Sequence, residues 1–197
     1  MRSLFKTVVA ALLVCAVVLM SSCTSLLTSK IIVKNKVEED TSETASIAFE
    51  RTFAVGNCGV EVAADGNWDK VDADGIDLQL ENDDIGAYLY ITVYYRVDLA
   101  EEMTAERAFN AQNEIFFETY ENVCAVNETE VKSSDTRSVL ANTTSAECDG
   151  IENYYRSYMI DQADSDKLVW VLINSMPSTM DKNQEYFDCI VDKITVE

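Results

Sequence analysis

Carboxylates and thiols are the side chains that could do chemistry here, because the chain of 197 residues contains no histidine. Ser-His and Cys-His nucleophiles are therefore excluded. A glycosidase needs two carboxyl groups held about 5–10 Å apart. No motif marks such a pair among the 35 acidic residues. We expect that the protein is not an enzyme, and an envelope hydrolase that uses paired carboxylates is the alternative.

The first residues of the chain predict export. Arg2 and Lys6 precede an apolar run from Thr7 to Met20. This run is shorter than the about 20 residues that a membrane-spanning helix needs. A short basic start, a short apolar segment and then small residues are typical of a secretory signal. Here the small residues are two serines, and Cys23 follows them.

The run Leu19-Met20-Ser21-Ser22-Cys23 resembles a bacterial lipobox, in which small residues precede a lipidated cysteine. The modification needs a thiol, because the thiolate is the nucleophile that takes the lipid. The resemblance implies that residues 1–22 are a signal peptide and that Cys23 carries palmitate-type acyl chains. Two or more chains anchor a protein stably, so we expect a lipid-anchored protein on the extracytoplasmic face of the cell membrane. A plain cleaved signal and an uncleaved anchor are the alternatives.

The charge of the chain bears on its partners. It has 15 basic and 35 acidic residues, a net charge of −20. Removal of Arg2 and Lys6 with the signal leaves 13 − 35 = −22. Such a surface repels nucleic acid and anionic lipid head groups, so we expect no nucleic-acid partner. The charge indicates either solubility near a negative envelope or capture of a cationic ligand.

The thiols other than Cys15 and Cys23 show no metal-binding pattern. They are Cys58, Cys124, Cys148 and Cys189, without a C-x-x-C motif or a histidine. We therefore predict no zinc site. Export permits disulfides, three pairings are possible, and all four thiols could also stay reduced. Cys124 with Cys148 is the favoured pair, because these residues flank the ends of a predicted hairpin.

Several acidic turns could suggest calcium. The stretch Asp65-Gly66-Asn67-Trp68-Asp69 begins like an EF-hand loop. Lys70 stands where the loop needs glycine and Ile76 where it needs glutamate, so the pattern fails. The stretches 72–75 and 161–166 are similar. We interpret all three as hairpin turns that use aspartate for local hydrogen bonds. We predict no metal or cofactor, and a calcium-responsive surface protein remains an alternative.

Tyrosines form the candidate ligand site. Tyr88, Tyr90 and Tyr94 lie on one face of a predicted strand, and a second group, Tyr154, Tyr155 and Tyr158, lies on another. An exposed aromatic platform could bind a glycan or a peptide, because tyrosine combines apolar area with a hydroxyl. The alternative is that a helix covers the tyrosines.

The apolar periodicity predicts the elements that would position these residues. Ala87 to Val97 and 168–173 are apolar on both faces, which is typical of central strands. Further strands are expected at 46–55, 59–63, 76–80, 125–132, 136–147 and 151–161. A helix is expected over 104–122, capped by Thr104, with Val123 on its buried stripe and Phe117 off it. A last helix is expected after Pro177, capped by Ser178, with Phe187, Ile190, Val191 and Ile194 buried.

Local features along residues 46–197 carry a resemblance at the level of fold. They are Gly59-Val60-Glu61-Val62 leading to Trp68, the strand Ala87-Tyr88-Leu89-Tyr90-Ile91, the helix start Thr104-Ala105-Glu106, and the closing Ile190-Val191-Asp192-Lys193-Ile194. This pattern resembles the PsbP-like fold of photosystem extrinsic subunits, a Ran-binding protein and many bacterial lipoproteins. The resemblance implies an α+β domain, a mostly antiparallel sheet with helices on both faces (an α/β/α sandwich), and a noncatalytic role in contacting proteins.

These observations give one organisation for the whole chain. Residues 1–22 are the signal peptide, residues 23–45 a lipid-attached tether and residues 46–197 one globular domain. We expect a membrane-anchored surface lipoprotein with a noncatalytic binding or assembly domain. Its partners would be the membrane, through the lipid on Cys23, and a protein or another component of the envelope.

Overall fold

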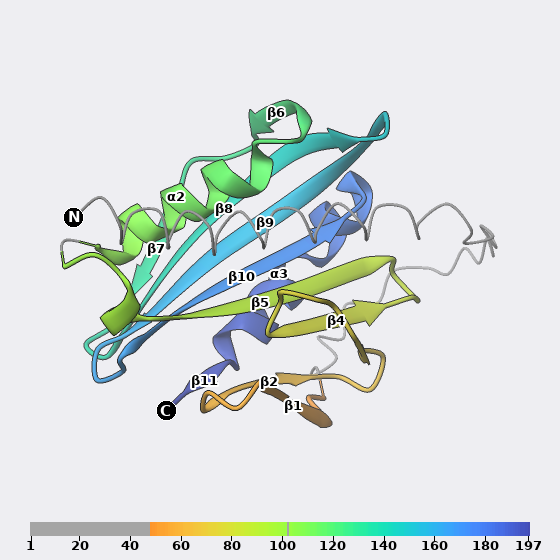
Figure 1. Ribbon diagram of the computed structural model, residues 1–197. Helices are drawn as coiled ribbons and strands as arrows, with labels where there is room; N and C mark the ends of the chain where they lie inside the picture. The colour runs from red at the N-terminus through yellow and green to blue at the C-terminus, as the bar shows by residue number, and fades with distance from the viewer. Residues whose placement is uncertain (1–47, 102) are drawn as a thin grey trace.

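The computed structural model describes residues 48–101 and 103–197, and a long antiparallel sheet dominates it (Figure 1). The strands of this sheet follow the order β3-β4-β5-β10-β9-β8-β6, and β7 also pairs with β8. In chain order they are β3 (Asp69–Val71), β4 (Leu78–Asn82), β5 (Ala87–Tyr95), β6 (Glu121–Ala125), β7 (Glu130–Ser133), β8 (Arg137–Cys148), β9 (Ile151–Gln162) and β10 (Lys167–Ser175). The prediction of a mostly antiparallel sheet is confirmed.

A second, three-stranded sheet has the order β1-β2-β11 and joins the two ends of the described chain. Its strands are β1 (Arg51–Val55), β2 (Val60–Ala64) and β11 (Thr195–Val196). It lies below the large sheet in Figure 1, near the C-terminus. The predicted strand from residue 46 begins only at Arg51, and its first two residues lie outside the described part.

The two predicted central strands are the middle of the large sheet. β5 lies between β4 and β10, and β10 lies between β5 and β9. Leu89, Ile91 and Val171 pack into one hydrophobic cluster, whereas Tyr90 and Leu172 pack into another. Because successive side chains of a strand point to opposite faces, the sheet has a hydrophobic cluster on each face.

The first helix, α2 (Ala105–Phe117), belongs to the cluster that contains Tyr90 and Trp170. Its predicted cap is confirmed, since the Thr104 hydroxyl accepts a hydrogen bond from the backbone N–H of Arg107 at 3.2 Å. Phe117, which did not fit the predicted stripe, is buried and lies edge-on to Tyr155.

The predicted end of this helix was wrong by several residues. The chain leaves α2 at Phe117 and continues as β6, where Val123 is exposed instead of buried. Asn122 has a left-handed φ of 51° at an irregularity of the β6–β8 pairing. Asparagine tolerates that conformation better than most residues, so Asn122 fits the irregular pairing of β6 with β8.

The second helix, α3 (Pro177–Asp192), belongs to the other cluster, together with β1 and β2 of the small sheet. Its predicted buried stripe is confirmed, because Phe187, Ile190, Val191 and Ile194 are at most 1% exposed. The predicted cap was wrong. Met176 is the N-cap residue and no side chain caps the helix. Pro177 takes the first helical position, where its fixed φ suits the helix, and this places Ser178 inside the first turn.

The four described cysteines, Cys58, Cys124, Cys148 and Cys189, form no disulfide with one another. The favoured disulfide is absent because its two cysteines are not opposite each other. In the sheet, Cys124 pairs with Ser145 and Cys148 pairs with Ile151. In the part of the chain that the structure describes, neither helix has the length and apolar character that crossing a bilayer would require.

The two predicted caps give a matched pair of substitutions. We expect Thr104→Ala to lower the free energy of unfolding by about 1 kcal/mol, because the hydroxyl satisfies an N–H group that α2 leaves free. Ser178→Ala should change it by less than about 0.5 kcal/mol. Urea unfolding followed by circular dichroism measures both. Equal losses in the two variants would contradict the assignment of the caps.

Candidate functional site

The predicted tyrosine site lies largely beneath α2. Tyr90 is 7% exposed, Tyr88 and Tyr94 are half-buried, and all three pack into the α2 cluster. The Tyr94 hydroxyl donates a hydrogen bond to Gln112 of α2 at 2.6 Å. Tyr90 and Tyr94 are therefore covered by a helix, as the alternative interpretation of the tyrosine group expected.

The carboxylates of the acidic turns point to different partners. In the turn at residues 65–69, Asp65 accepts a hydrogen bond from the backbone N–H of Asn67 at 2.9 Å, and Asp69 forms an ion pair with Arg51 at 2.9 Å. In the turn at 161–166, Asp161 pairs with Arg96. Among residues 48–101 and 103–197, no group of three or more acidic or cysteine side chains is arranged to hold a metal ion.

The candidate site is a cavity of about 470 Å³ between residues 48–50, the 65–67 turn, the β4–β5 turn and α3. Its lining consists of three carboxylates, three carboxamides, one tyrosine and small or apolar residues: Glu50, Asp65, Asp84, Asn67, Asn82, Asn183, Tyr186, Gly66, Ala48 and Ile85. A Cβ atom added to Gly66 would lie 3.4 Å from Oε2 of Glu50. The Glu50 carboxylate therefore lies directly against the 65–67 turn.

Tyr186 of α3 ties one wall of this cavity together. Its hydroxyl donates a hydrogen bond to Oδ2 of Asp65 at 2.7 Å and accepts one from Nε1 of Trp68 at 2.6 Å. Burial, and then the bond to Asp65, raise the pKa of Tyr186 above its ordinary value. The hydroxyl thus keeps its proton and holds Oδ2 of Asp65, while the backbone N–H of Asn67 holds Oδ1.

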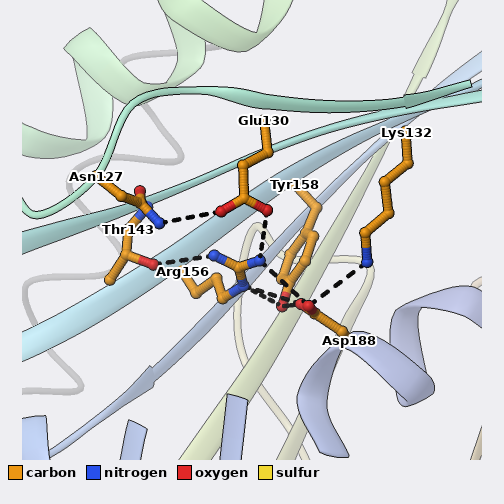
Figure 2. Close-up of polar contacts among 7 residues, drawn as sticks. All are labelled: Asn127, Glu130, Lys132, Thr143, Arg156, Tyr158 and Asp188. Carbon is orange, nitrogen blue, oxygen red and sulfur yellow. Dashed lines mark hydrogen bonds and ion pairs between the residues drawn. The ribbon is translucent and has the colours of Figure 1, made fainter. Parts of the chain in front are cut away.

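The opposite flank of α3 carries Asp188. Tyr186 and Asp188 are two positions apart, which corresponds to about 200° around a helix of about 3.6 residues per turn. Figure 2 shows Asp188 meeting Arg156 of β9. Nε of Arg156 lies 2.9 Å from Oδ1 of Asp188, and Nη2 lies 3.3 Å from Oδ2. Such a two-point contact fixes both the distance and the orientation of the helix.

Arg156 is fully buried, and each of its three side-chain nitrogens has at least one acceptor. Besides Asp188, the guanidinium bonds to Thr143 at 3.1 Å and to the Tyr158 hydroxyl at 3.0 Å. Glu130 of β7 lies 3.5 Å from Nη2 and is 46% exposed. Lys132 of β7 adds a second cation 3.6 Å from Asp188. This network, hereafter the Arg156 network, joins β7, β8, β9 and α3.

The charges of this network support one another. Burial raises the pKa of the Asp188 carboxyl, but hydrogen bonds from Arg156 and Tyr158 outweigh burial, so its pKa lies below the ordinary 3.8. Burial raises the pKa of Tyr158 well above 10 although Arg156 lowers it. The Tyr158 hydroxyl therefore stays protonated and donates to Oδ1 of Asp188 at 2.8 Å.

A second arginine caps the far end of α3. Nη1 of Arg137 donates to the carbonyl oxygen of Ile194 at 2.6 Å, and Nη2 donates to that of Val191 at 2.8 Å. The last carbonyl groups of a helix have no partner within the helix, and a basic side chain there also suits the helix dipole. α3, which supplies Asn183 and Tyr186 to the cavity, is thus fixed at its C-terminal end and on both flanks.

Sequence reasoning missed the cavity and the Arg156 network. Arg156 was one residue in a predicted strand. The available signal was its place between Tyr154 and Tyr158 on the same strand face, where a charge must find a partner. Asn82 and Tyr186 gave no such signal, because they come together from positions more than a hundred residues apart. Cys23, the predicted lipidation site, lies outside the described residues.

Comparison with known proteins shows a shared fold. No family model and no curated protein matches the chain. The PsbP protein CyanoP of Synechocystis sp. PCC 6803 has a TM-score of 0.54 at 13% identity, covering 80% of this chain and 98% of its own. The Ran-binding protein Mog1p of Saccharomyces cerevisiae has a TM-score of 0.54 at 10% identity, and the match covers 74% of this chain and 94% of Mog1p. LpqN of Mycobacterium tuberculosis, which is involved in cell envelope biogenesis, has a TM-score of 0.51 at 5% identity, and the match covers 69% of this chain and 82% of LpqN. The predicted PsbP-like fold is confirmed.

The two carboxylates near Arg156 allow a test of the network. We expect Asp188→Ala to lower the free energy of unfolding by about 3–5 kcal/mol, because it leaves a buried guanidinium without its main partner. Glu130→Ala removes a half-exposed carboxylate at the rim and should cost at most about 1 kcal/mol. Urea unfolding of both variants measures the difference. A cost for Glu130→Ala as large as that for Asp188→Ala would contradict the ranking.

The lowered pKa of Asp188 also predicts a pH dependence. A carboxyl with a depressed pKa in the folded state stabilises the fold above its unfolded pKa, and loses this contribution as the pH falls through the folded value. The difference in free energy of unfolding between the native chain and Asp188→Asn should therefore be constant near pH 7 and shrink below about pH 4. Denaturant unfolding from pH 7 to pH 2 measures it, and a difference that stays constant to pH 2 would contradict the assignment.

Proposed function

We propose that this protein is a lipid-anchored surface protein whose folded domain is a noncatalytic binding or assembly module. Residues 1–22 act as the signal, Cys23 takes the lipid, residues 23–45 form the tether, and residues 46–197 form the domain, displayed on the extracytoplasmic face of the membrane. Its partner is a protein or another envelope component, and nucleic acid is excluded by the charge of −20.

The acidic cavity is the observation that carries the binding role. It is a concave site formed by four separate segments, and its polar groups line a space of about 470 Å³. Small-molecule sites have about 300–1,000 Å³ and a few convergent polar groups. The lining lacks the nucleophile and base pairs of acyl-transfer enzymes, since the chain has no histidine.

The fold supports the same conclusion by analogy. Mog1p binds Ran, and LpqN takes part in cell envelope biogenesis. These roles suggest that the fold presents surfaces for contact with partners. We also infer that α2 and α3, each in the hydrophobic cluster of one sheet face, make the domain an α/β/α sandwich.

A hydrolase is the second candidate, because three carboxylates line one cavity. Asp65 is held by Tyr186 and Asn67, which leaves Glu50 and Asp84 as the pair that a hydrolytic mechanism would use. Turnover of a chromogenic glycoside that stops in Glu50→Gln would favour this candidate over a binding module. Calcium binding remains the third candidate, and calcium-dependent melting would reveal it.

The lipid anchor is tested at Cys23. We expect Cys23→Ala to abolish metabolic labelling with radioactive palmitate and to release the protein from membranes or stall its processing, because Cys23 is the thiol that directly follows the two serines. Cys15→Ala, within the apolar run, is the matched control and should label normally. Labelling of Cys23→Ala at the level of the native chain would exclude the proposed anchor.

A cross-linking experiment addresses the binding role directly. The anchored protein is treated in intact cells with a cross-linker that reacts with carboxylates, and adducts are identified by mass spectrometry. A defined envelope partner attached near the cavity supports the module. Adducts spread evenly over the surface contradict it.

A further inference from the structure

The outer edges of the large sheet differ in how they are protected. The sheet ends with β3 on one side and with β6 and β7 on the other. β3 has only three residues, and the pairing of β6 with β8 changes register between Glu121 and Cys124. Short and irregular edge strands discourage pairing with another chain. β7 keeps one register with β8 along its whole length, and all of its residues are exposed.

The outer side of β7 presents backbone hydrogen-bonding groups. Among the residues that the structure describes, β7 pairs with β8 and with no other strand. The N–H of Ser134 bonds to the carbonyl oxygen of Arg137 at 2.8 Å and closes the turn between the two strands. Bonded and non-bonded residue pairs alternate along an antiparallel ladder. Lys132 therefore bonds to β8, whereas Val131 directs its N–H and C=O groups away from β8.

The side chains of β7 indicate which strand would fit against it. Glu130 and Lys132 extend to the same face of the sheet (Figure 2) and are still 46% and 56% exposed. If two β7 strands pair antiparallel about Val131, Glu130 of each copy lies opposite Lys132 of the other. Opposite charges at facing positions stabilise a sheet and like charges destabilise it. A pairing centred on Glu130 or on Lys132 would instead place like charges opposite each other.

The overall charge makes this local match decisive. Two chains that each carry −20 repel one another, so a second copy needs an edge with balanced charges. In β6 the charged residue is Glu121, without a base. In β3, Asp69 already pairs with Arg51 at 2.9 Å. Of these three edge strands, β7 is the one in which one acid and one base flank a central exposed valine, since Val131 is 61% exposed.

We propose that β7 pairs with β7 of a second copy of this chain about a two-fold axis at Val131. The two valines exchange backbone N–H···O=C bonds, and two Glu130–Lys132 ion pairs flank them. The large sheets of the two copies then form one continuous sheet. Symmetric dimers use the same surface of both copies, and addition of a strand to an exposed edge is an established mode of association. The inference depends on β7 alone and goes beyond the proposed function.

Disulfide cross-linking tests the register of this pairing. The Cα atoms of a hydrogen-bonded antiparallel pair lie about 5.5 Å apart, which a disulfide can span. We expect Val131→Cys, as the full-length protein in a neutral detergent under mild oxidation, to form a covalent dimer. Mass spectrometry of the linked peptides should show a disulfide between the two introduced thiols. Ser133→Cys is the matched control on the same strand. In this register its two copies are displaced by about 13 Å along the strands, so they should not link to each other.

Reversal of the charges tests the ion pairs. Glu130→Lys and Lys132→Glu each place like charges opposite each other in a dimer of one variant. Each should weaken the dimer by about tenfold or more in sedimentation velocity. An equimolar mixture of the two variants should associate again, because every lysine then faces a glutamate. Mixing cannot repair a fold that either substitution damages within its own chain. Lys70→Glu makes the same charge change on β3, at the other edge, and should leave the affinity within about twofold.

The inference is overturned if the native chain stays monomeric at every concentration. It is also overturned if Ser133→Cys links as readily as Val131→Cys, or if the mixture associates no better than its two components. A dimer that neither charge reversal weakens would contradict the pairing through β7. The proposed function is tested separately, by palmitate labelling at Cys23 and by cross-linking near the cavity, so its failure and the failure of the dimer are distinguishable.

Discussion

A buried positive charge constrains the whole domain. Arg156 lies in the middle of β9 with no exposed surface, and a guanidinium remains charged at all physiological pH values. Its desolvation is tolerable only if carboxylate and hydroxyl acceptors surround it. Asp188 must therefore lie within reach, and that requirement sets both the height and the rotation of α3 on the sheet. β7 joins the same charge through Glu130, although its strand is exposed along its length.

The position of α3 in turn determines the cavity. Asp188 fixes one flank of the helix, which directs Tyr186 on the opposite flank toward Asp65 and Trp68. The hydrogen bonds of Arg137 to the carbonyl groups of Val191, in the last turn, and of Ile194, just past it, hold the C-terminal end of the helix. A site made of four separate segments thus depends on a helix that is held by side-chain bonds and a buried apolar stripe, because no side chain caps its N-terminus.

Patterns that depend on neighbouring residues could be predicted from the sequence. The central strands β5 and β10, the buried stripe of α3 and the cap at Thr104 follow from apolar periodicity and from a single hydroxyl before a helix. The end of α2 could not be predicted, because apolar residues at helical spacing continue past Phe117, where the helix ends, to Val123, which lies in β6. Ser178 was misassigned because Pro177 takes the first helical position. Arg156 with Asp188, and Asn82 with Tyr186, are partners only in the folded chain, so no local rule could find them.

The two tryptophans of the chain divide between the two faces of the sheet. Nε1 of Trp68 donates to Tyr186 of α3, and Nε1 of Trp170 donates to Asn113 of α2 at 3.3 Å. Each indole is therefore hydrogen-bonded to the helix that covers its own face. Intrinsic fluorescence from a chain with only one of them reports a single helix: Trp68 reports the helix beside the acidic cavity, and Trp170 the helix above the tyrosines.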